Sequence, residues 1–332
     1  MYVDEPLNRM ETIKNTEERT DQYREFCPNS LLKECRLCPR KCGVDRLQGV
    51  PGYCRVDAAV RLGRAALHMW EEPCISGQTG SGAVFFAGCS LHCVYCQNGK
   101  LSLAKEGIAV SEERLSEIFL ELQEQKAVNI NLVTADQYIP QVIEAVAAAR
   151  ERGLIIPIVW NCSGYESVAS LKLLQGTVDI YLTDFKYIRS ETARRYSHAP
   201  DYPEVVKAAL AEMVHQQPVP VWDHSNGELL HRGVIVRYLL LPGHVNEGKE
   251  ILSYLHETYG ERILISIMNQ YTPPEEIGEV FPELARRVTK REYETLITHA
   301  LETGIENGFI QDGETAVESF IPSFKGEGVR KE

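Results

Sequence analysis

From about residue 82 onward, short apolar segments alternate with longer segments of helical periodicity, and this alternation restricts the possible folds most. The first apolar segment, 82–87, is bounded by glycines, as buried strands often are. Further strands are predicted over 128–133, 155–160, 178–182, 234–240 and 263–268. Strands that alternate with helices form a parallel sheet with right-handed crossovers. The sequence therefore predicts an α/β fold with six β/α units.

Helical periodicity fills the intervals between these strands. Ser111 can cap the first helix, whose apolar face then carries Leu115, Ile118, Phe119 and Leu122. Other helices are predicted before Gly153 and over 166–174, 202–215, 246–259 and 289–302. Helices that cover such a sheet indicate a partial (β/α)6 barrel of the TIM-barrel kind, with its chemistry at the C-terminal strand ends. A polar insertion over 223–232 precedes the fifth strand.

Composition and charge restrict the partners. The 332 residues carry a net charge of −12, which argues against a general nucleic-acid or membrane-surface role. No segment approaches the roughly 20 apolar residues that span a bilayer. Residues 1–24 are polar and lack the apolar stretch of a signal peptide. We therefore expect a cytoplasmic protein, in a compartment that keeps thiols reduced.

The cysteines are concentrated in one part of the chain. Nine of the ten lie between Cys27 and Cys96, and only Cys162 lies beyond them. In a reduced compartment, such clustering indicates metal binding before disulfides.

Three of these cysteines follow the first predicted strand directly. Cys89, Cys93 and Cys96 have the spacing Cys-x3-Cys-x2-Cys. Three thiolates on one short loop can bind three irons of a cubane and leave the fourth iron open for a substrate. Two alternatives are a zinc site that includes His92 and free cysteines packed in a core.

This loop, with an aromatic residue before its last cysteine, resembles the radical S-adenosylmethionine (AdoMet) superfamily. The wider segments GSGAVFFAGCSLHCVYCQN and ECRLCPRKCGVDR are similar to a narrower group. That group resembles pyruvate formate-lyase activating enzyme and carries an N-terminal cysteine motif. The likeness extends from Glu34 to Phe324.

The resemblance implies a mechanism and partners. AdoMet would bind the open iron of a [4Fe–4S] cluster, and a reduced cluster would cleave it to a 5′-deoxyadenosyl radical that removes hydrogen from a substrate. A ferredoxin or flavodoxin would supply the electron. A glycyl radical enzyme would be the protein partner if the chain is an activase.

Residues at the strand ends are candidates for binding AdoMet. Tyr95 matches the superfamily aromatic that lies near adenine, with ordinary packing as the alternative. After the second strand many relatives carry Gly-Gly-Glu, whereas this chain has Val-Thr-Ala-Asp, which makes Thr134 and Asp136 candidates for the AdoMet amino group. Asn161 and Ser163 follow the third strand and suit the ribose or the methionine moiety.

The fourth and fifth strands add charged candidates. Asp184 and Lys186 lie on one side of their strand and resemble the Asp-x-Lys of glycyl-radical activases; a surface ion pair is the alternative. Arg237 interrupts an apolar strand, so it needs an anionic partner. That partner is either the AdoMet carboxylate or a structural acid.

Four upstream cysteines form a second group. Cys35, Cys38, Cys42 and Cys54 fit a structural zinc ion or an auxiliary iron–sulfur cluster, and a redox pair or inert thiols are the alternatives. Cys74 is a possible extra ligand, a substrate-facing thiol or a small buried hydrophobe.

The sequence thus divides into four parts and leaves three functions open. The parts are a polar lead-in (1–30), a Cys-rich metal-binding subdomain (31–80), the partial barrel (81–325) and a polar tail (326–332). The functions are a glycyl-radical activase, a radical enzyme that modifies a small molecule or a side chain, and a non-catalytic iron–sulfur redox sensor.

Overall fold

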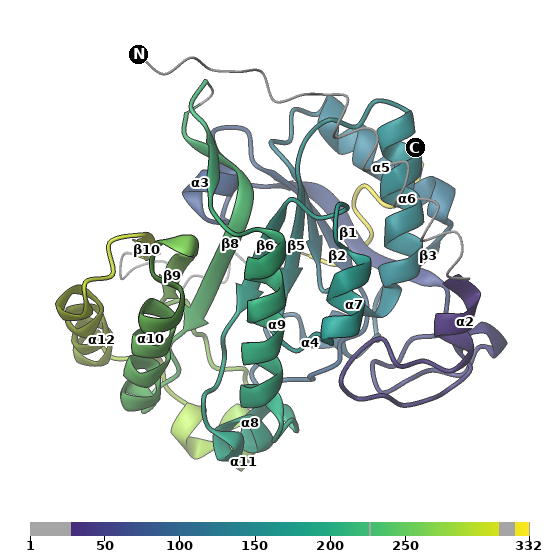
Figure 1. Cartoon of the computed structure of the whole chain (residues 1–332). Helices are drawn as coiled ribbons and strands as arrows, with labels where there is room; N and C mark the ends of the chain where they lie inside the picture. Colours follow the sequence, from purple (N-terminus) through teal and green to yellow (C-terminus); the bar gives the residue numbers. More distant parts are fainter. Residues whose placement is uncertain (1–27, 226, 312–322, 332) are drawn as a thin grey trace.

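The computed structural model describes residues 28–225, 227–311 and 323–331, and shows a mixed α/β fold around a mostly parallel sheet (Figure 1). The predicted lead-in, together with Cys27, lies almost wholly outside the described residues. Among the described residues, no helix combines the length and the apolar character that crossing a bilayer requires.

The sheet contains the six predicted parallel strands as direct neighbours. Its order is β10-β9-β8-β6-β5-β4-β2-β1-β3, and β7 pairs with β8. The strands are β1 (Val60–His68), β2 (Ser81–Phe86), β3 (Ile108–Val110), β4 (Ile130–Val133), β5 (Ile158–Cys162), β6 (Ile180–Asp184), β7 (Val221–Asp223), β8 (Leu229–Leu239), β9 (Leu264–Met268) and β10 (Gly308–Ile310). From β2 to β10 every neighbouring pair is parallel. The α/β prediction is confirmed, and closure into a partial barrel stays a prediction.

Helices follow the parallel strands and lie along the sheet in Figure 1. The helices are α2 (Pro28–Lys33), α3 (Pro73–Ser76), α4 (Gly99–Ser102), α5 (Glu112–Glu124), α6 (Ile139–Glu151), α7 (Val168–Leu173), α8 (Ser190–Ser197), α9 (Tyr202–Gln216), α10 (Val245–Tyr259), α11 (Ile277–Val280) and α12 (Lys290–Thr303). Ser111 caps α5 as predicted, because its side chain accepts a hydrogen bond from the Arg114 amide.

Side chains alternate between the two faces of the strands, and this alternation separates the main core from the site. On β5, Trp160 and Cys162 belong to the main apolar cluster, which α5, α6, α9 and α10 complete. Val159 points to the opposite face, where it packs with Ile180, Leu182 and α3. That second cluster fills the inner face toward the N-terminal strand ends, so the polar residues that follow along the strands are left at the C-terminal ends.

The Cys-rich subdomain predicted over residues 31–80 contains a strand that was not predicted. Residues 60–68 form β1, which pairs antiparallel with β2 and β3 and belongs to the main sheet. The strand was missed because its buried and half-exposed positions do not alternate regularly, which weakens a period-of-two pattern. Part of the predicted Cys-rich subdomain is therefore sheet.

Two other predicted segments pair with strands of the sheet. The described part of the predicted tail packs on the sheet, since Val329 is buried and the Ala65 amide donates to the Glu327 carbonyl oxygen. The predicted polar insertion over 223–232 contains the turn between β7 and β8 and the start of β8. In both places the backbone pairs with a neighbouring strand, and the polar composition of the segment does not indicate this pairing.

A close backbone contact after β5 depends on Gly164. Its φ is +78°, and a Cβ atom there would overlap the carbonyl oxygen of Asp184. Gly153 also has a positive φ, but a Cβ atom there would have open space. We expect Gly164→Ala to lower the free energy of unfolding by about 3 kcal/mol and Gly153→Ala by about 1 kcal/mol. Denaturant unfolding measures both, and equal losses would contradict the close contact.

Candidate active site

The cysteine loop begins directly after β2 and turns back over the C-terminal ends of the strands. Gly88 starts the turn with φ +87°, and a Cβ atom there would lie 2.7 Å from the Cys54 carbonyl oxygen. Cys89, Cys93 and Cys96 are all half-buried and line the same cavity. A glycine at the start of the loop is thus what allows the thiols to reach the cavity.

This one cavity brings together every residue predicted to bind the cluster or AdoMet except Asp136. Besides the three thiols, its lining includes Tyr95 from the loop and six residues from the strand ends: Thr134, Asn161, Ser163, Asp184, Lys186 and Arg237. Parallel strands place their C-terminal ends at the same edge of a sheet, so residues far apart in the sequence meet there. The structure places these residues together; their roles stay predictions.

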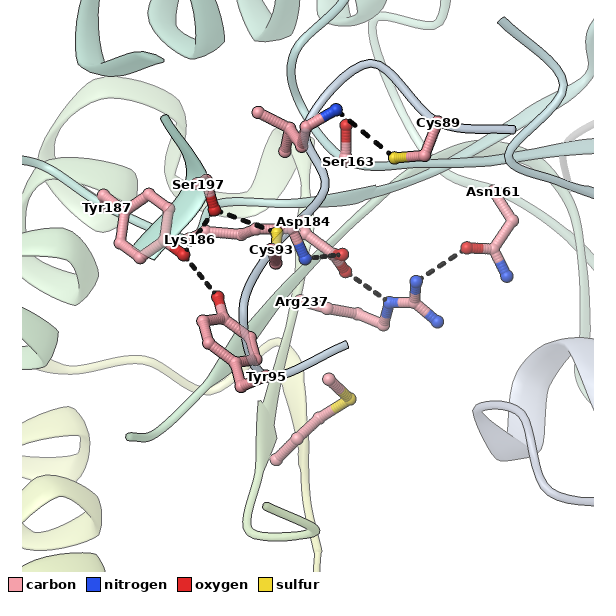
Figure 2. Close-up of polar contacts among 12 residues, drawn as sticks. Cys89, Cys93, Tyr95, Asn161, Ser163, Asp184, Lys186, Tyr187, Ser197 and Arg237 are labelled. Atoms are coloured by element: carbon pink, nitrogen blue, oxygen red, sulfur yellow. Dashed lines mark hydrogen bonds and ion pairs between the residues drawn. The ribbon is translucent and has the colours of Figure 1, made fainter. Parts of the chain in front are cut away.

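A chain of charged and amide groups connects the strand ends (Figure 2). Asp184 and Arg237 are register partners on β6 and β8, and Arg237 Nε donates to Asp184 Oδ1 at 2.9 Å. Lys186 Nζ lies 2.5 Å from Asp184 Oδ2, and Arg237 Nη2 lies 2.6 Å from Asn161 Oδ1. These side chains are mostly buried, so the surface-ion-pair alternative is wrong.

Arg237 is satisfied by groups of the protein itself. Besides Asp184 and Asn161, its Nη1 lies 3.4 Å from Glu71 Oε2, and Glu71 Oε1 accepts from Asn131 Nδ2 at 3.0 Å. Of the two partners considered for Arg237, the structure thus contains the structural acid. Lys186 has one protein carboxylate among its recorded contacts, and an ammonium group has three donors.

Electrostatic interactions keep Asp184 and Lys186 charged, although both side chains are mostly buried. Burial by itself would raise the pKa of the Asp184 carboxyl, but Arg237 and Lys186 hold it below the usual value. Burial would likewise lower the pKa of the Lys186 ammonium, but Asp184 and Cys93 raise it above the usual value. Burial dominates for Glu71 and raises its pKa, although Arg237 and Asn131 oppose the shift.

A hydrogen-bonded chain leads from the core to one of the loop thiols. Tyr95 Oη lies 2.6 Å from Tyr187 Oη, Tyr187 Oη lies 2.7 Å from Ser197 Oγ, and Ser197 Oγ donates to Cys93 Sγ at 2.9 Å (Figure 2). The hydroxyl of Tyr95 is therefore fixed by Tyr187, while one edge of the ring lines the cavity.

The donor set fits a cubane better than a single ion. Among the described residues, no three His, Cys, Asp or Glu side chains converge closely enough to bind one metal ion. Tetrahedral zinc would need thiolate sulfurs only about 4 Å apart, as its Zn–S bonds of about 2.3 Å require. The ligands of a cubane bind different irons, so they need not converge on one point.

Cys162 also borders the cavity but does not add a fourth thiol to this set. It alternates with Asn161 on β5, and its thiol lies beside Glu166, Asp136 and Thr183 on the outer face. The three loop thiols instead interact with one another. The donor set that faces the cavity is therefore the loop trio, with which an open iron is compatible.

Two candidates for the AdoMet amino group have different surroundings. Thr134 lines the cavity with φ +59°, a conformation unusual for a β-branched residue. Asp136 is buried and accepts from the Trp160 indole at 3.1 Å, away from the cavity lining. Asp136 as an AdoMet ligand is therefore wrong.

Several residues that line the cavity or lie beside it were not predicted. Glu71 and Trp70 come from the segment after β1, whose strand was itself missed. Ser197 ends α8, which had no predicted counterpart, and it reaches Cys93 only through the folding of the chain. Tyr187 and Tyr271, which contact Tyr95, do not occur at a sequence spacing that singles them out. The only local sequence feature that could have predicted Glu71 at the cavity is the pair of acidic residues before Pro73.

The remaining cysteines lie apart from this cavity lining. Cys74 is buried in the second apolar cluster, where burial raises the pKa of its thiol to about 12. Burial also raises the pKa of the Cys38 thiol to about 12, and nearby Cys54, Cys42 and Cys35 add to this increase. The four upstream thiols are thus close neighbours of one another.

The fold and the cysteine loop agree with a match to known proteins. Residues 83–255, which are half of the chain, match the family model of the radical SAM superfamily. The chain belongs to this superfamily. Membership implies an enzyme that holds a [4Fe–4S] cluster and AdoMet and that needs an electron donor. Three thiols of one loop line the cavity, and thiolates are the ligands that such clusters take.

One similar protein is an uncharacterized protein of Methanocaldococcus jannaschii. It is 27% identical over 273 residues, which are 80% of this chain and 73% of the relative. The likeness therefore extends well beyond the cysteine loop.

The Ser197 hydroxyl gives a test of how the cavity tunes its cluster. Hydrogen bonds to a ligand sulfur withdraw electron density and ease reduction of the cluster. We expect Ser197→Ala to shift the cluster's reduction potential to a more negative value, as measured by an EPR-monitored redox titration. Ser225→Ala, at an exposed position in the turn between β7 and β8, is the control and leaves the potential unchanged. An unchanged potential in Ser197→Ala would contradict the contact with Cys93.

Proposed function

We propose that Cys89, Cys93 and Cys96 bind the [4Fe–4S] cluster and that the adjoining strand ends bind AdoMet. The observation that supports this most strongly is the single cavity shared by three thiols of one loop and the Lys186 ammonium group. When bound, a reduced cluster supplies the electron that cleaves the C5′–S bond of AdoMet and yields the 5′-deoxyadenosyl radical.

Lys186 is suited to the carboxylate of AdoMet. Its ammonium lies near Cys93 and Cys96, since Cys93 raises the pKa of Lys186 and Lys186 acts to lower the pKa of the Cys96 thiol. Asp184 takes one of its donors and fixes the position of the nitrogen. The remaining donors can form charge-assisted hydrogen bonds to an anion beside the cluster. Arg237 acts through Asp184 and Asn161, which it holds in place, and is a positioning residue.

Other lining residues suit the remaining groups of AdoMet. Its ammonium group can be accepted by carboxylates, and Glu71 and Asp184 are the acidic side chains recorded in the cavity lining. Asn161, Ser163 and Thr134 offer amide and hydroxyl groups to the ribose hydroxyls. Tyr95 offers an immobilised aromatic ring for the adenine.

We further propose that the substrate is a backbone glycine of a partner protein, so that the chain is a glycyl-radical activase. Support comes from the likeness of Asp184-Phe185-Lys186 to the activase pattern and from the rim of the cavity. Trp70 lines the cavity and is 62% exposed, and its neighbour Met69 is 44% exposed. An exposed apolar rim suits contact with another polypeptide. A flavodoxin or ferredoxin is the proposed electron donor.

Loss of one loop thiol tests the cluster assignment. Cys93→Ala should retain the fold but abolish formation of 5′-deoxyadenosine after anaerobic reconstitution and dithionite reduction, because the cluster loses a ligand. Cys74→Ala removes a buried thiol from the second apolar cluster instead and should retain turnover. Equal product from Cys93→Ala and the wild type would refute the ligand role. Wild-type protein that yields no 5′-deoxyadenosine would favour the redox sensor.

Loss of the Lys186 charge tests the AdoMet site separately from the cluster. A charge-assisted hydrogen bond contributes about 1.5–3 kcal/mol, so Lys186→Met should weaken AdoMet binding by about 10- to 100-fold. Calorimetric titration of AdoMet into the reconstituted protein measures this effect. Lys172→Met on the exposed face of α7 is the matched control, with unchanged affinity. Unchanged affinity in Lys186→Met would remove this lysine from the site.

The activase proposal has a spectroscopic test. Reduced enzyme with AdoMet and a candidate glycyl radical enzyme should give a stable glycine-centred EPR doublet on the partner. Cys93→Ala is the control and should give none. If wild-type enzyme forms 5′-deoxyadenosine only with a small molecule or a side-chain substrate, the activase subtype is wrong while the radical chemistry remains.

A further inference from the structure

The four upstream thiols surround a short segment of irregular backbone beside α2. A Cβ atom on Gly52 would lie 3.3 Å from Cys42 Sγ and 3.5 Å from Cys54 Sγ, so these two sulfurs flank the same glycine. The Tyr53 amide donates to Cys42 Sγ at 3.4 Å. Cys38 lies within electrostatic range of Cys35, Cys42 and Cys54. Four thiols from 20 residues thus occupy one small volume.

Backbone hydrogen bonds hold this segment in a fixed shape. The Cys35 amide donates to the Val44 carbonyl oxygen at 3.0 Å, and the Gly43 amide donates to the Cys35 carbonyl oxygen at 2.9 Å. The Lys41 amide donates to the Cys38 carbonyl oxygen at 3.0 Å. The apolar cluster beneath is small: its fully buried members are Leu32, Cys35 and Leu37. A core of this size contributes little to holding four thiols together.

A buried cation adjoins the thiols without an acidic partner. Arg46 is 1% exposed, and its guanidinium donates to the carbonyl oxygens of Asp57 and Gln137. Its Nη1 also lies 3.9 Å from Cys35 Sγ, and it is close to Cys54. Among the described residues, no carboxylate forms an ion pair with it. A buried charge is costly unless an opposite charge compensates it, so this guanidinium calls for an anion at the thiols.

We propose that Cys35, Cys38, Cys42 and Cys54 bind a second, fully ligated iron–sulfur cluster, and that Arg46 compensates its negative charge. Four thiolates around an iron–sulfur core give the centre a net negative charge, and Arg46 is the buried cation beside it. This centre is independent of the AdoMet chemistry at the loop.

Four thiols suit a cluster, because its ligands bind different irons and need not converge on one point. A single ion requires at least three converging ligands, and none of the described residues form such a group. The loop trio, which we propose binds a cubane, has the same property. A cluster that distributes its ligands over several irons accommodates both sets.

The proposed centre adjoins the active-site loop directly. Arg40, between Cys38 and Cys42, donates from Nε to the Ser90 carbonyl oxygen at 2.9 Å and from Nη2 to the Ser197 carbonyl oxygen at 3.1 Å. Tyr53 stacks on His92 with ring centroids 4.8 Å apart. The segment that holds the second centre therefore also contacts the residues between the loop cysteines.

Removal of the loop ligands isolates the second centre. The variant Cys89→Ala/Cys93→Ala/Cys96→Ala is reconstituted anaerobically with ferrous iron, sulfide and equimolar zinc, and its metals are measured. We expect about four irons and four sulfides per chain, with a charge-transfer band near 400 nm or above. Adding Cys38→Ser and Cys54→Ser should reduce the iron to background, whereas adding Cys74→Ala should leave it unchanged. Circular dichroism checks that each variant is folded.

A charge variant tests the role of Arg46. In the background without loop cysteines, Arg46→Gln should shift the reduction potential of the remaining cluster to a more negative value, because a nearby positive charge is lost. Arg55→Gln, at an exposed position near Cys54, should change it much less.

Three results would overturn the proposal: no metal in the loop variant, zinc as its only metal, or iron that persists without Cys38 and Cys54. Failure here is separable from failure of the proposed function. Cys38→Ser/Cys54→Ser with intact loop cysteines would then still bind the loop cluster and form 5′-deoxyadenosine.

Discussion

The buried Asp184 carboxylate, held between Arg237 and Lys186, is the interaction on which the arrangement of the cavity depends. The parallel register of β6 and β8 sets Asp184 opposite Arg237. Because each charge would be costly alone in this environment, the three side chains are stable only together. Asn161 and Glu71 complete the coordination of Arg237, so four segments of the chain are fixed relative to one another at the strand ends.

Side chains alternate between the two faces of each strand, and this alternation creates the site. Along β5 the inner face changes from Val159, in an apolar cluster, to Asn161 at the cavity, while Trp160 on the outer face stays in the main core. The apolar part of each strand thus secures the sheet, and the last residues are available for chemistry. The cysteine loop lies at this edge, so that its three thiols and Lys186 line the same cavity.

The N-terminal segment links two groups of cysteines that the sequence separates. Arg40 and Tyr53 contact the loop between Cys89 and Cys93, and Ser197 connects the same region to Cys93. A loop that holds a cluster has few internal hydrogen bonds, so its shape depends on neighbours of this kind. Arg46 belongs to the same segment, and its buried guanidinium joins the segment to the core by donating to the carbonyl oxygens of Asp57 and Gln137.

The sequence by itself determined the α/β class, the six parallel strands and the cysteine trio, because hydrophobic periodicity and thiol spacing are local properties. It also singled out Asp184, Lys186 and Arg237, since charged residues at the ends of apolar strands stand out. Only the tertiary structure decided that Arg237 pairs with Asp184, that β1 joins the sheet and that Ser197 reaches Cys93. These contacts join positions up to about a hundred residues apart, and no local pattern encodes which distant groups the packing of helices on a sheet brings together.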